Sequence, residues 1–256
     1  MERQIPDFLV IGAAKSGTTS LISDLKNHPE IHTPGFEINY FSHFYSNGPE
    51  WYHSLFNCPE KIQGEKSTSY LYETECHKRI FSHNPSIKLI VLLREPVKRA
   101  FSNWAMRYTQ GRLLKQTHLF NKHNLNIIEN IGFSHLFNAY LNSESDVVRH
   151  QEPLDIFERG LYIEQLTHLR RFFSAGQILI LISERYFKNP EPELKKLSSF
   201  LNVSDFPSAP PAWKRKSEYY AKPNEATIHS IRQFYKPYNE KLFRFLGFEI
   251  DEWSQL

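Results

Sequence analysis

The chain has 256 residues, of which 40% are hydrophobic and 14% aromatic, so it can bury a sizeable core, and its composition argues against global disorder. A net charge of only +3 argues against a nucleic-acid binder, and no apolar run approaches the ~20 residues of a membrane helix. Cys58 and Cys76 fit no metal pattern, and no secretory leader precedes the first predicted strand. We therefore expect a cytoplasmic protein. From its charge and hydropathy we expect neither a nucleic-acid nor a membrane partner.

Three short apolar runs predict buried strands, because each lacks the alternation of a strand with one exposed face. A helical pattern follows each run, and two further helices are predicted, the last one broken or kinked at Pro237. The predicted elements, in chain order, are strand 8–11, helix 18–27, strand 89–93, helix 96–108, helix 161–173, strand 178–182, helix 191–201 and helix 224–245. Strands that alternate with helices predict an α/β fold with a central, mostly parallel sheet and helices on both faces.

No internal repeat or linker divides the sequence, so we expect a single domain over residues 1–256. Residues 111–132 are polar and weakly periodic. This segment is predicted to be an insertion or a mobile lid over the site.

The turn after the first strand reads Gly-Ala-Ala-Lys-Ser-Gly-Thr-Thr over residues 12–19. A strand, a glycine loop and a helix in this order make an anion cradle, because backbone N–H groups and the positive end of the helix dipole point to one spot. The turn therefore predicts a phosphate or sulfate site, although the same glycines would also suit an ordinary tight turn. The candidate binding residues are Lys15, Ser16, Gly17, Thr18, Thr19 and Ser20.

The turn departs from a standard P-loop, which places Lys directly after the second glycine. Here Thr18 occupies that position and the lysine lies inside the loop, at Lys15. No Asp at a strand end suggests itself as a Mg²⁺ ligand. A P-loop kinase or NTPase is therefore the weaker alternative.

A second anion site is predicted after the strand at 89–93, which ends at Arg94. Ligands of parallel sheets collect at the carboxyl ends of the strands, and a guanidinium grips phosphate through two parallel hydrogen bonds. Ser102 in the following helix can flank the same ligand if that helix packs close. The alternative for Arg94 is a surface ion pair with Glu95 or Glu65.

Together these motifs resemble the sulfotransferases that use 3′-phosphoadenosine-5′-phosphosulfate (PAPS), and in particular the branch of the heparan sulfate N- and 3-O-sulfotransferases and their bacterial relatives. The turn resembles the 5′-phosphosulfate loop of that family, and Arg94 and Ser102 resemble its 3′-phosphate site. Further matching segments are Glu37-Ile-Asn-Tyr-Phe41, Trp51-Tyr52, Glu65-Lys-Ser-Thr-Ser-Tyr70, and Leu161-Tyr162 to Arg171-Phe-Phe173. The resemblance runs from about Phe8 to Phe248 and implies a P-loop-NTPase-like sulfotransferase fold.

The resemblance also implies roles. Glu37 matches the family's catalytic base, Lys15 would neutralise charge on the oxygen that leaves with 3′,5′-ADP, and Lys66 matches a lysine near the transferred group. A basic loop would close on the 3′-phosphate, although this chain lacks the glycine usual there. PAPS has no polyphosphate chain to bridge, so no metal is expected. The cations of that loop are Lys214, Arg215 and Lys216.

Each of these residues also has a structural reading. Outside the family pattern, Glu37 would be a solvated loop residue, Lys66 a surface partner of Glu65 or Glu73, and residues 214–216 a solvated charge run. A protein that kept the fold but lost the chemistry, as a nucleotide- or glycan-binding module, is a further alternative.

The acceptor is left open. The 3-O-sulfotransferases carry His where this chain has Asn39, an acidic residue near Ser42, and a late cysteine pair that is missing here. We therefore expect a small metabolite or a saccharide as acceptor. The sequence decides neither between oxygen and nitrogen nor the oligomeric state.

Overall fold

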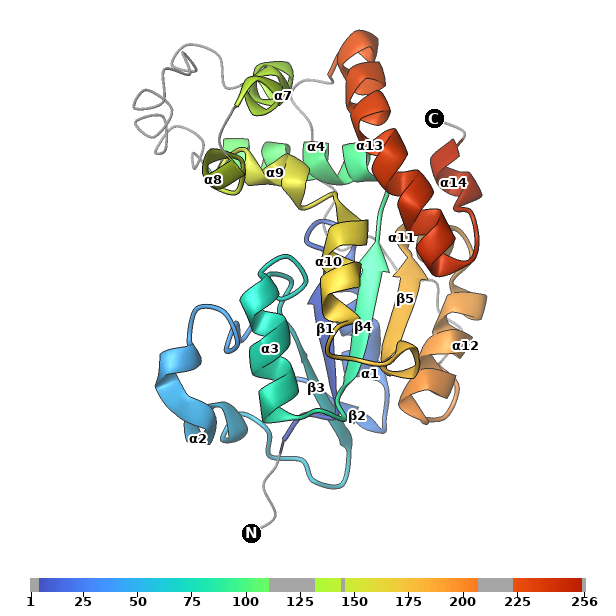
Figure 1. Cartoon of the computed structure of the whole chain (residues 1–256). Helices are drawn as coiled ribbons and strands as arrows, with labels where there is room; N and C mark the ends of the chain where they lie inside the picture. Colours follow the sequence, from blue (N-terminus) through green and yellow to red (C-terminus); the bar gives the residue numbers. More distant parts are fainter. Residues whose placement is uncertain (1–4, 111–131, 144–145, 207–222, 255–256) are drawn as a thin grey trace. The chain divides into compact units, whose positions relative to one another are not determined.

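The computed structural model describes residues 5–110, 132–143, 146–206 and 223–254 (Figure 1). Contacts divide the chain into two compact units: Met1–Arg94 with Glu164–Arg215, and Glu95–Ile163 with Lys216–Leu256. The single domain over 1–256 stays a prediction. The predicted insertion at 111–132 lies, apart from Gly132, outside the described residues.

The first unit contains a five-stranded sheet in which every neighbouring pair is parallel. The strands are β1 (Phe8–Gly12), β2 (Ile31–His32), β3 (Ile62–Lys66), β4 (Lys88–Leu93) and β5 (Ile178–Ile182). Their order is β2-β3-β1-β4-β5, so the two strands predicted earliest in the chain, β1 and β4, lie side by side. The predicted α/β class with a parallel sheet is confirmed.

The three predicted strands form, and two more join them. The prediction that all three are covered on both faces is wrong for β5, whose first three residues are only half-buried. The reason is its place at the edge of the sheet, where neighbours cover it on fewer sides. The added strands β2 and β3 pair with each other, and β3 pairs with β1.

Helices flank this sheet on both faces, as predicted. Alternate strand residues such as Phe8, Val10 and Leu92 pack with Leu21 and Leu25 of α1 (Thr18–Asn27) and with α12 (Pro190–Leu201). The opposite face is overlaid by α3 (Thr74–His83) and α10 (Tyr162–Leu169) (Figure 1).

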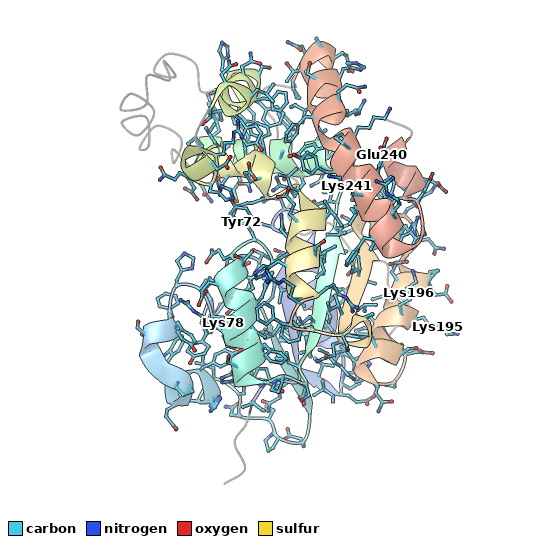
Figure 2. All side chains as sticks on the ribbon, viewed as in Figure 1. Tyr72, Lys78, Lys195, Lys196, Glu240 and Lys241 are labelled. Atoms are coloured by element: carbon cyan, nitrogen blue, oxygen red, sulfur yellow. The ribbon has the colours of Figure 1, made fainter. Side chains whose placement is uncertain are left out.

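The sequence of α12 explains its packing, because apolar residues recur at helical spacing on one side. Leu194, Leu197 and Leu201 are buried, whereas Lys195 and Lys196 are exposed and project away from the sheet (Figure 2). The remaining elements of this unit are the 3₁₀ helices η1 (Tyr45–Asn47) and η2 (Ala175–Gln177), α2 (Gly48–His53) and α11 (Ser183–Lys188).

The described part of the second unit is helical. Its core is rich in aromatic side chains, among them Phe101, Trp104, Phe137 and Phe157. The buried Arg107 pairs with Asp155 at 2.5 Å, so this charge is compensated inside the core. The helices are α4 (Pro96–Thr109), α7 (Phe133–Asn142), α8 (Asp146–Arg149), α9 (Asp155–Glu158), α13 (Glu225–Leu246) and α14 (Asp251–Ser254).

Two helix predictions need correction. The helix predicted at 161–173 ends at Leu169, because the amides of Arg171 and Phe172 bond three residues back and tighten the last turn. The helix predicted at 224–245 is not broken at Pro237: α13 runs through it, with Ile231 and Tyr235 before it and Leu242 after it all buried. Packing on both sides outweighs the single backbone bond that proline cannot make.

In the part of the chain that the structure describes, no helix has both the length and the apolar character to cross a membrane. Cys58 and Cys76 are both free thiols.

Candidate active site

The carboxyl ends of all five strands lie at one edge of the sheet, because the strands are parallel. The glycine loop leaves β1 there, Lys66 ends β3, and Arg94 follows β4. The segment after β2 leads to Glu37. The predicted residues of the glycine loop, Glu37, Lys66 and Arg94 therefore come from loops and strand ends that follow these strands.

The glycine loop has two residues in the left-handed region of backbone space, Lys15 with φ 72° and Gly17 with φ 96°. Gly17 is the N-cap of α1, and a Cβ at this position would lie 2.5 Å from the Phe187 ring. Both the backbone angle and the close ring require glycine. Since glycine has no side chain, the first N–H groups of α1 receive no side-chain cap from it.

Three hydrogen bonds hold the backbone of this loop from outside. The Arg94 guanidinium donates to the Lys15 carbonyl at 3.0 Å, and the Ser183 hydroxyl donates to the Ser16 carbonyl at 2.8 Å. The Ala13 amide donates to the Leu92 carbonyl at 2.9 Å. The Arg94 side chain therefore lies against the loop, and its role at a 3′-phosphate stays a prediction.

The hydroxyls of the loop and first helical turn are mostly buried: Ser16, Thr18 and Ser20 are covered, and Thr19 is half-buried. Among the described residues, the Ser16 hydroxyl is buried without a hydrogen-bond partner. A buried polar group without a partner costs free energy. An anion in this cradle, with its lone pairs, is the kind of group that would satisfy it.

Glu37 and Lys66 form an ion pair of 2.7 Å, and the Thr68 hydroxyl lies 3.5 Å from the same carboxylate oxygen. The Lys66 side chain is 12% exposed and that of Glu37 is 36% exposed. Lys66 therefore pairs with Glu37. The alternative prediction, in which Lys66 is a surface partner of Glu65 or Glu73, does not describe this ion pair. Val10, two residues before the glycine loop, pairs with Lys66 in the sheet, so this ion pair starts from the strand beside the loop.

The residue before Lys66 was not predicted as part of the site. The Glu65 carboxyl is fully buried and accepts hydrogen bonds from Ser67 at 2.6 Å and from Tyr52 at 3.4 Å. Burial raises the pKa of Glu65 to about 7, the hydrogen bonds from Ser67 and Tyr70 lower it in part, and the negative charge of Glu37 raises it again. A buried Glu leaves no trace in hydropathy, so only its place inside the matching segment could have revealed it.

Asn39 lies two residues after Glu37 and adopts a left-handed backbone with φ 53°. Its amide donates to the Ser67 hydroxyl at 2.8 Å, and its side-chain oxygen accepts from Ser69 at 3.2 Å. Asn tolerates this backbone region better than most residues. The segment bearing Glu37 is therefore tied to the residues that follow β3.

The other predicted site residues are placed differently. Ser102 is buried in α4, in the second unit. Lys214, Arg215 and Lys216 lie outside the described residues, so their roles stay predictions. Over the described ranges, no group of three or more His, Cys, Asp or Glu could hold a metal ion.

Comparison with known proteins identifies the family. The family model of the sulfotransferase domain matches residues 5–231. The chain belongs to the sulfotransferase family. The resemblance drawn from the sequence is confirmed.

Among the similar proteins are two heparan sulfate glucosamine 3-O-sulfotransferases. Form 3A1 of Mus musculus is 28% identical over 272 residues, which cover 96% of this sulfotransferase and 64% of the relative. Form 6 of Homo sapiens is also 28% identical, covering 96% and 73%. The chain thus spans less than two thirds of the length of the first of these relatives.

The fold is also that of solved sulfotransferases. A sulfotransferase from Alicyclobacillus acidocaldarius superposes with a TM-score of 0.76 at 22% identity, covering 98% of this chain and 99% of that one. The sulfotransferase domain of the curacin biosynthetic pathway superposes with a TM-score of 0.55 at 12% identity, covering 96% and 99%. The predicted sulfotransferase fold is confirmed.

Proposed function

We propose that this sulfotransferase moves the sulfuryl group of PAPS to a hydroxyl or amine of a saccharide or small metabolite and releases 3′,5′-ADP. The observation that carries the proposal is the Glu37–Lys66 ion pair on the strand next to the Lys15 loop. Sulfuryl transfer needs a base for the acceptor and positive charge for the leaving group, and Glu37, Lys15 and Lys66 supply these groups beside an anion-binding loop. The names of the relatives favour a saccharide hydroxyl as acceptor.

The residues present fit PAPS. Its 5′-phosphosulfate would lie on the loop and first turn from Lys15 to Ser20, where a buried Ser16 hydroxyl has no partner among the described residues. The contacts that the resemblance implies for its 3′-phosphate are Arg94, Ser102 and one or more of Lys214, Arg215 and Lys216, and these stay predictions. When bound, PAPS supplies an activated sulfuryl group with a nucleotide as leaving group. None of the residues proposed to hold PAPS needs a metal ion to bind it.

In this proposal Glu37 removes the proton from the acceptor atom as that atom attacks sulfur. Lys66, at 2.7 Å, holds the carboxylate of Glu37 in one orientation. The ammonium of Lys15 stabilises negative charge that grows on the leaving oxygen.

A cytoplasmic location also stays a prediction.

The test is Glu37→Gln, which keeps the size of the side chain and removes its basicity. We expect turnover of PAPS, measured by mass gain of an acceptor library, to fall by about 10²–10⁴-fold. Binding of 3′,5′-ADP, measured by calorimetry, should stay within about twofold, because Glu37 serves the acceptor side.

Glu60→Gln is the matched control, since Glu60 is an exposed carboxylate of the same unit. It should change neither turnover nor binding. Full activity of the Glu37→Gln variant would refute the assignment of the base. Binding of 3′,5′-ADP without turnover of any acceptor by the wild-type protein would instead favour the inactive binding module.

A further inference from the structure

Three buried hydroxyls interact with the Glu65 carboxyl. Ser67 donates to one of its oxygens at 2.6 Å and Tyr52 to the other at 3.4 Å. The Tyr70 hydroxyl interacts with this carboxyl and with the Ser67 hydroxyl. All four side chains belong to the first unit and are buried. Such a group is a closed network rather than a solvated charge.

Two of these hydroxyls also accept backbone N–H groups from the segment that bears Glu37. The Asn39 amide donates to Ser67 at 2.8 Å, and the Phe41 amide donates to Tyr70 at 3.2 Å. Two parallel relays thus run from the amides after Glu37, through one hydroxyl each, to the same carboxyl. Tyr52 donates to that carboxyl as well, but the structure gives its hydroxyl no bond to this segment.

The charge of Glu65 sets the direction of both relays. A hydroxyl has one proton, and an ionised carboxylate can only accept. When Glu65 is ionised, Ser67 and Tyr70 both point their protons at it and present lone pairs to the two amides. A neutral amide or carboxylic acid carries its own protons into the network, so it cannot orient every hydroxyl in this way.

We propose that Glu65 is a positioning residue for Glu37: its buried carboxylate orients the Ser67 and Tyr70 hydroxyls, and these hold the backbone that carries the catalytic base. The catalytic part of this inference rests on the proposed function. Glu37 itself forms an ion pair with Lys66, which follows Glu65 in β3. The side chain of Glu37 and the backbone after it are therefore both held by residues at the carboxyl end of β3. Burying a charged carboxyl costs free energy, and its use in ordering a neighbouring segment accounts for that cost.

The experiment compares Tyr70→Phe with Tyr52→Phe. Both changes remove one buried hydroxyl that interacts with Glu65, but only the Tyr70 hydroxyl accepts a backbone N–H of the segment after Glu37. The Tyr52 ring packs on Tyr40 and Phe41, and phenylalanine keeps these ring contacts. Amide hydrogen exchange of a peptide covering residues 37–41, followed by mass spectrometry, should become about tenfold faster in Tyr70→Phe and change less than about twofold in Tyr52→Phe. Ser67→Ala should behave like Tyr70→Phe.

Turnover gives a second readout. In Tyr70→Phe, Ser67→Ala and Glu65→Gln, kcat should fall by about 10–100-fold while KM for PAPS stays within about threefold, because the base is misplaced and the nucleotide loop is untouched. Tyr52→Phe should keep kcat within about threefold. If Glu65→Gln fails to fold, the two hydroxyl variants still decide.

Unchanged exchange over residues 37–41 in both folded hydroxyl variants would overturn the proposal, and so would equal effects of Tyr52→Phe and Tyr70→Phe. These exchange measurements need no substrate. If the wild-type protein transferred no sulfuryl group at all, the proposed function would fail, while the exchange data would still test whether Glu65 orders the segment.

Discussion

Burial raises the pKa of Glu65 to about 7, well above the usual value of 4.5. The folded protein therefore binds a proton at Glu65 more tightly than the unfolded chain does. The favourable contribution of this group is complete below pH 4.5 and is lost as pH rises through 7. Folding thus favours the neutral form, whereas the proposed positioning role needs the charged form.

The resulting prediction concerns stability. Between pH 4.5 and pH 8, the free energy of unfolding of the wild-type protein should fall by about 3 kcal/mol more than that of Glu65→Gln, which has no proton to lose. Urea unfolding of both proteins at several pH values measures this difference. The exposed Glu60→Gln variant should follow the wild-type curve. Parallel curves for wild type and Glu65→Gln would contradict the raised pKa.

At the scale of elements, the turn from β1 into α1 depends on Gly17 for two separable reasons. Its φ of 96° is strained for any residue with a Cβ, and that Cβ would lie 2.5 Å from Phe187. Gly247, at the end of α13, has a similar left-handed φ of 79°, but a Cβ there would have no atom within 4 Å. The two glycines therefore separate backbone strain from steric overlap.

We expect Gly247→Ala to lower the free energy of unfolding by about 1 kcal/mol, through backbone strain alone. Gly17→Ala should cost a further ~1–3 kcal/mol, the usual cost of overpacking a buried site. It should also weaken 3′,5′-ADP binding by at least about tenfold, since the loop must shift. Chemical denaturation and calorimetry measure both effects. Equal costs at the two glycines would mean that Phe187 does not restrict the turn.

The elements also show what could be predicted from the sequence. β1 and β4 are runs of buried apolar residues, and hydropathy alone predicted them. β3 was missed because its buried centre is Gln63, Gly64 and Glu65, and the side chains of Gln63 and Glu65 are polar groups that accept hydrogen bonds inside the fold. Gly64 lies against the Phe8 ring, where a Cβ would approach within 2.5 Å. Hydropathy cannot report a strand of this kind.

The candidate site also has a part that could be predicted from the sequence and a part that could not. The Lys15 loop is continuous in sequence, so its chemistry could be predicted from residue types and spacing. The pairing of Glu37 with Lys66 and the relays to Glu65 join residues that are about 30 positions apart. Only the resemblance placed Glu37 and Lys66 near one another, and nothing in the sequence indicated the Glu65 network.

At the scale of the whole molecule, the family and the fold leave the ligand to be tested. The matched family model spans residues 5–231, and the relatives at 28% identity are named for a saccharide acceptor. The glycine loop alone is compatible with other nucleotides, because a helix N-terminus attracts any phosphate. What distinguishes the proposed ligand is its second phosphate, for which Arg94 was predicted.

Thermal unfolding with different nucleotides tests that distinction. At about 100 times its Kd, 3′,5′-ADP should add about 2.7 kcal/mol of stability, which raises the Tm of a protein of this size by about 5–10 °C. Adenosine 5′-phosphate, which lacks the 3′-phosphate, should give a much smaller shift at the same concentration. Arg94→Ala should reduce the difference between the two nucleotides, because its guanidinium is the proposed contact of the 3′-phosphate. A larger shift with ATP and Mg²⁺ than with 3′,5′-ADP would instead favour the kinase or NTPase alternative and contradict the proposed use of PAPS.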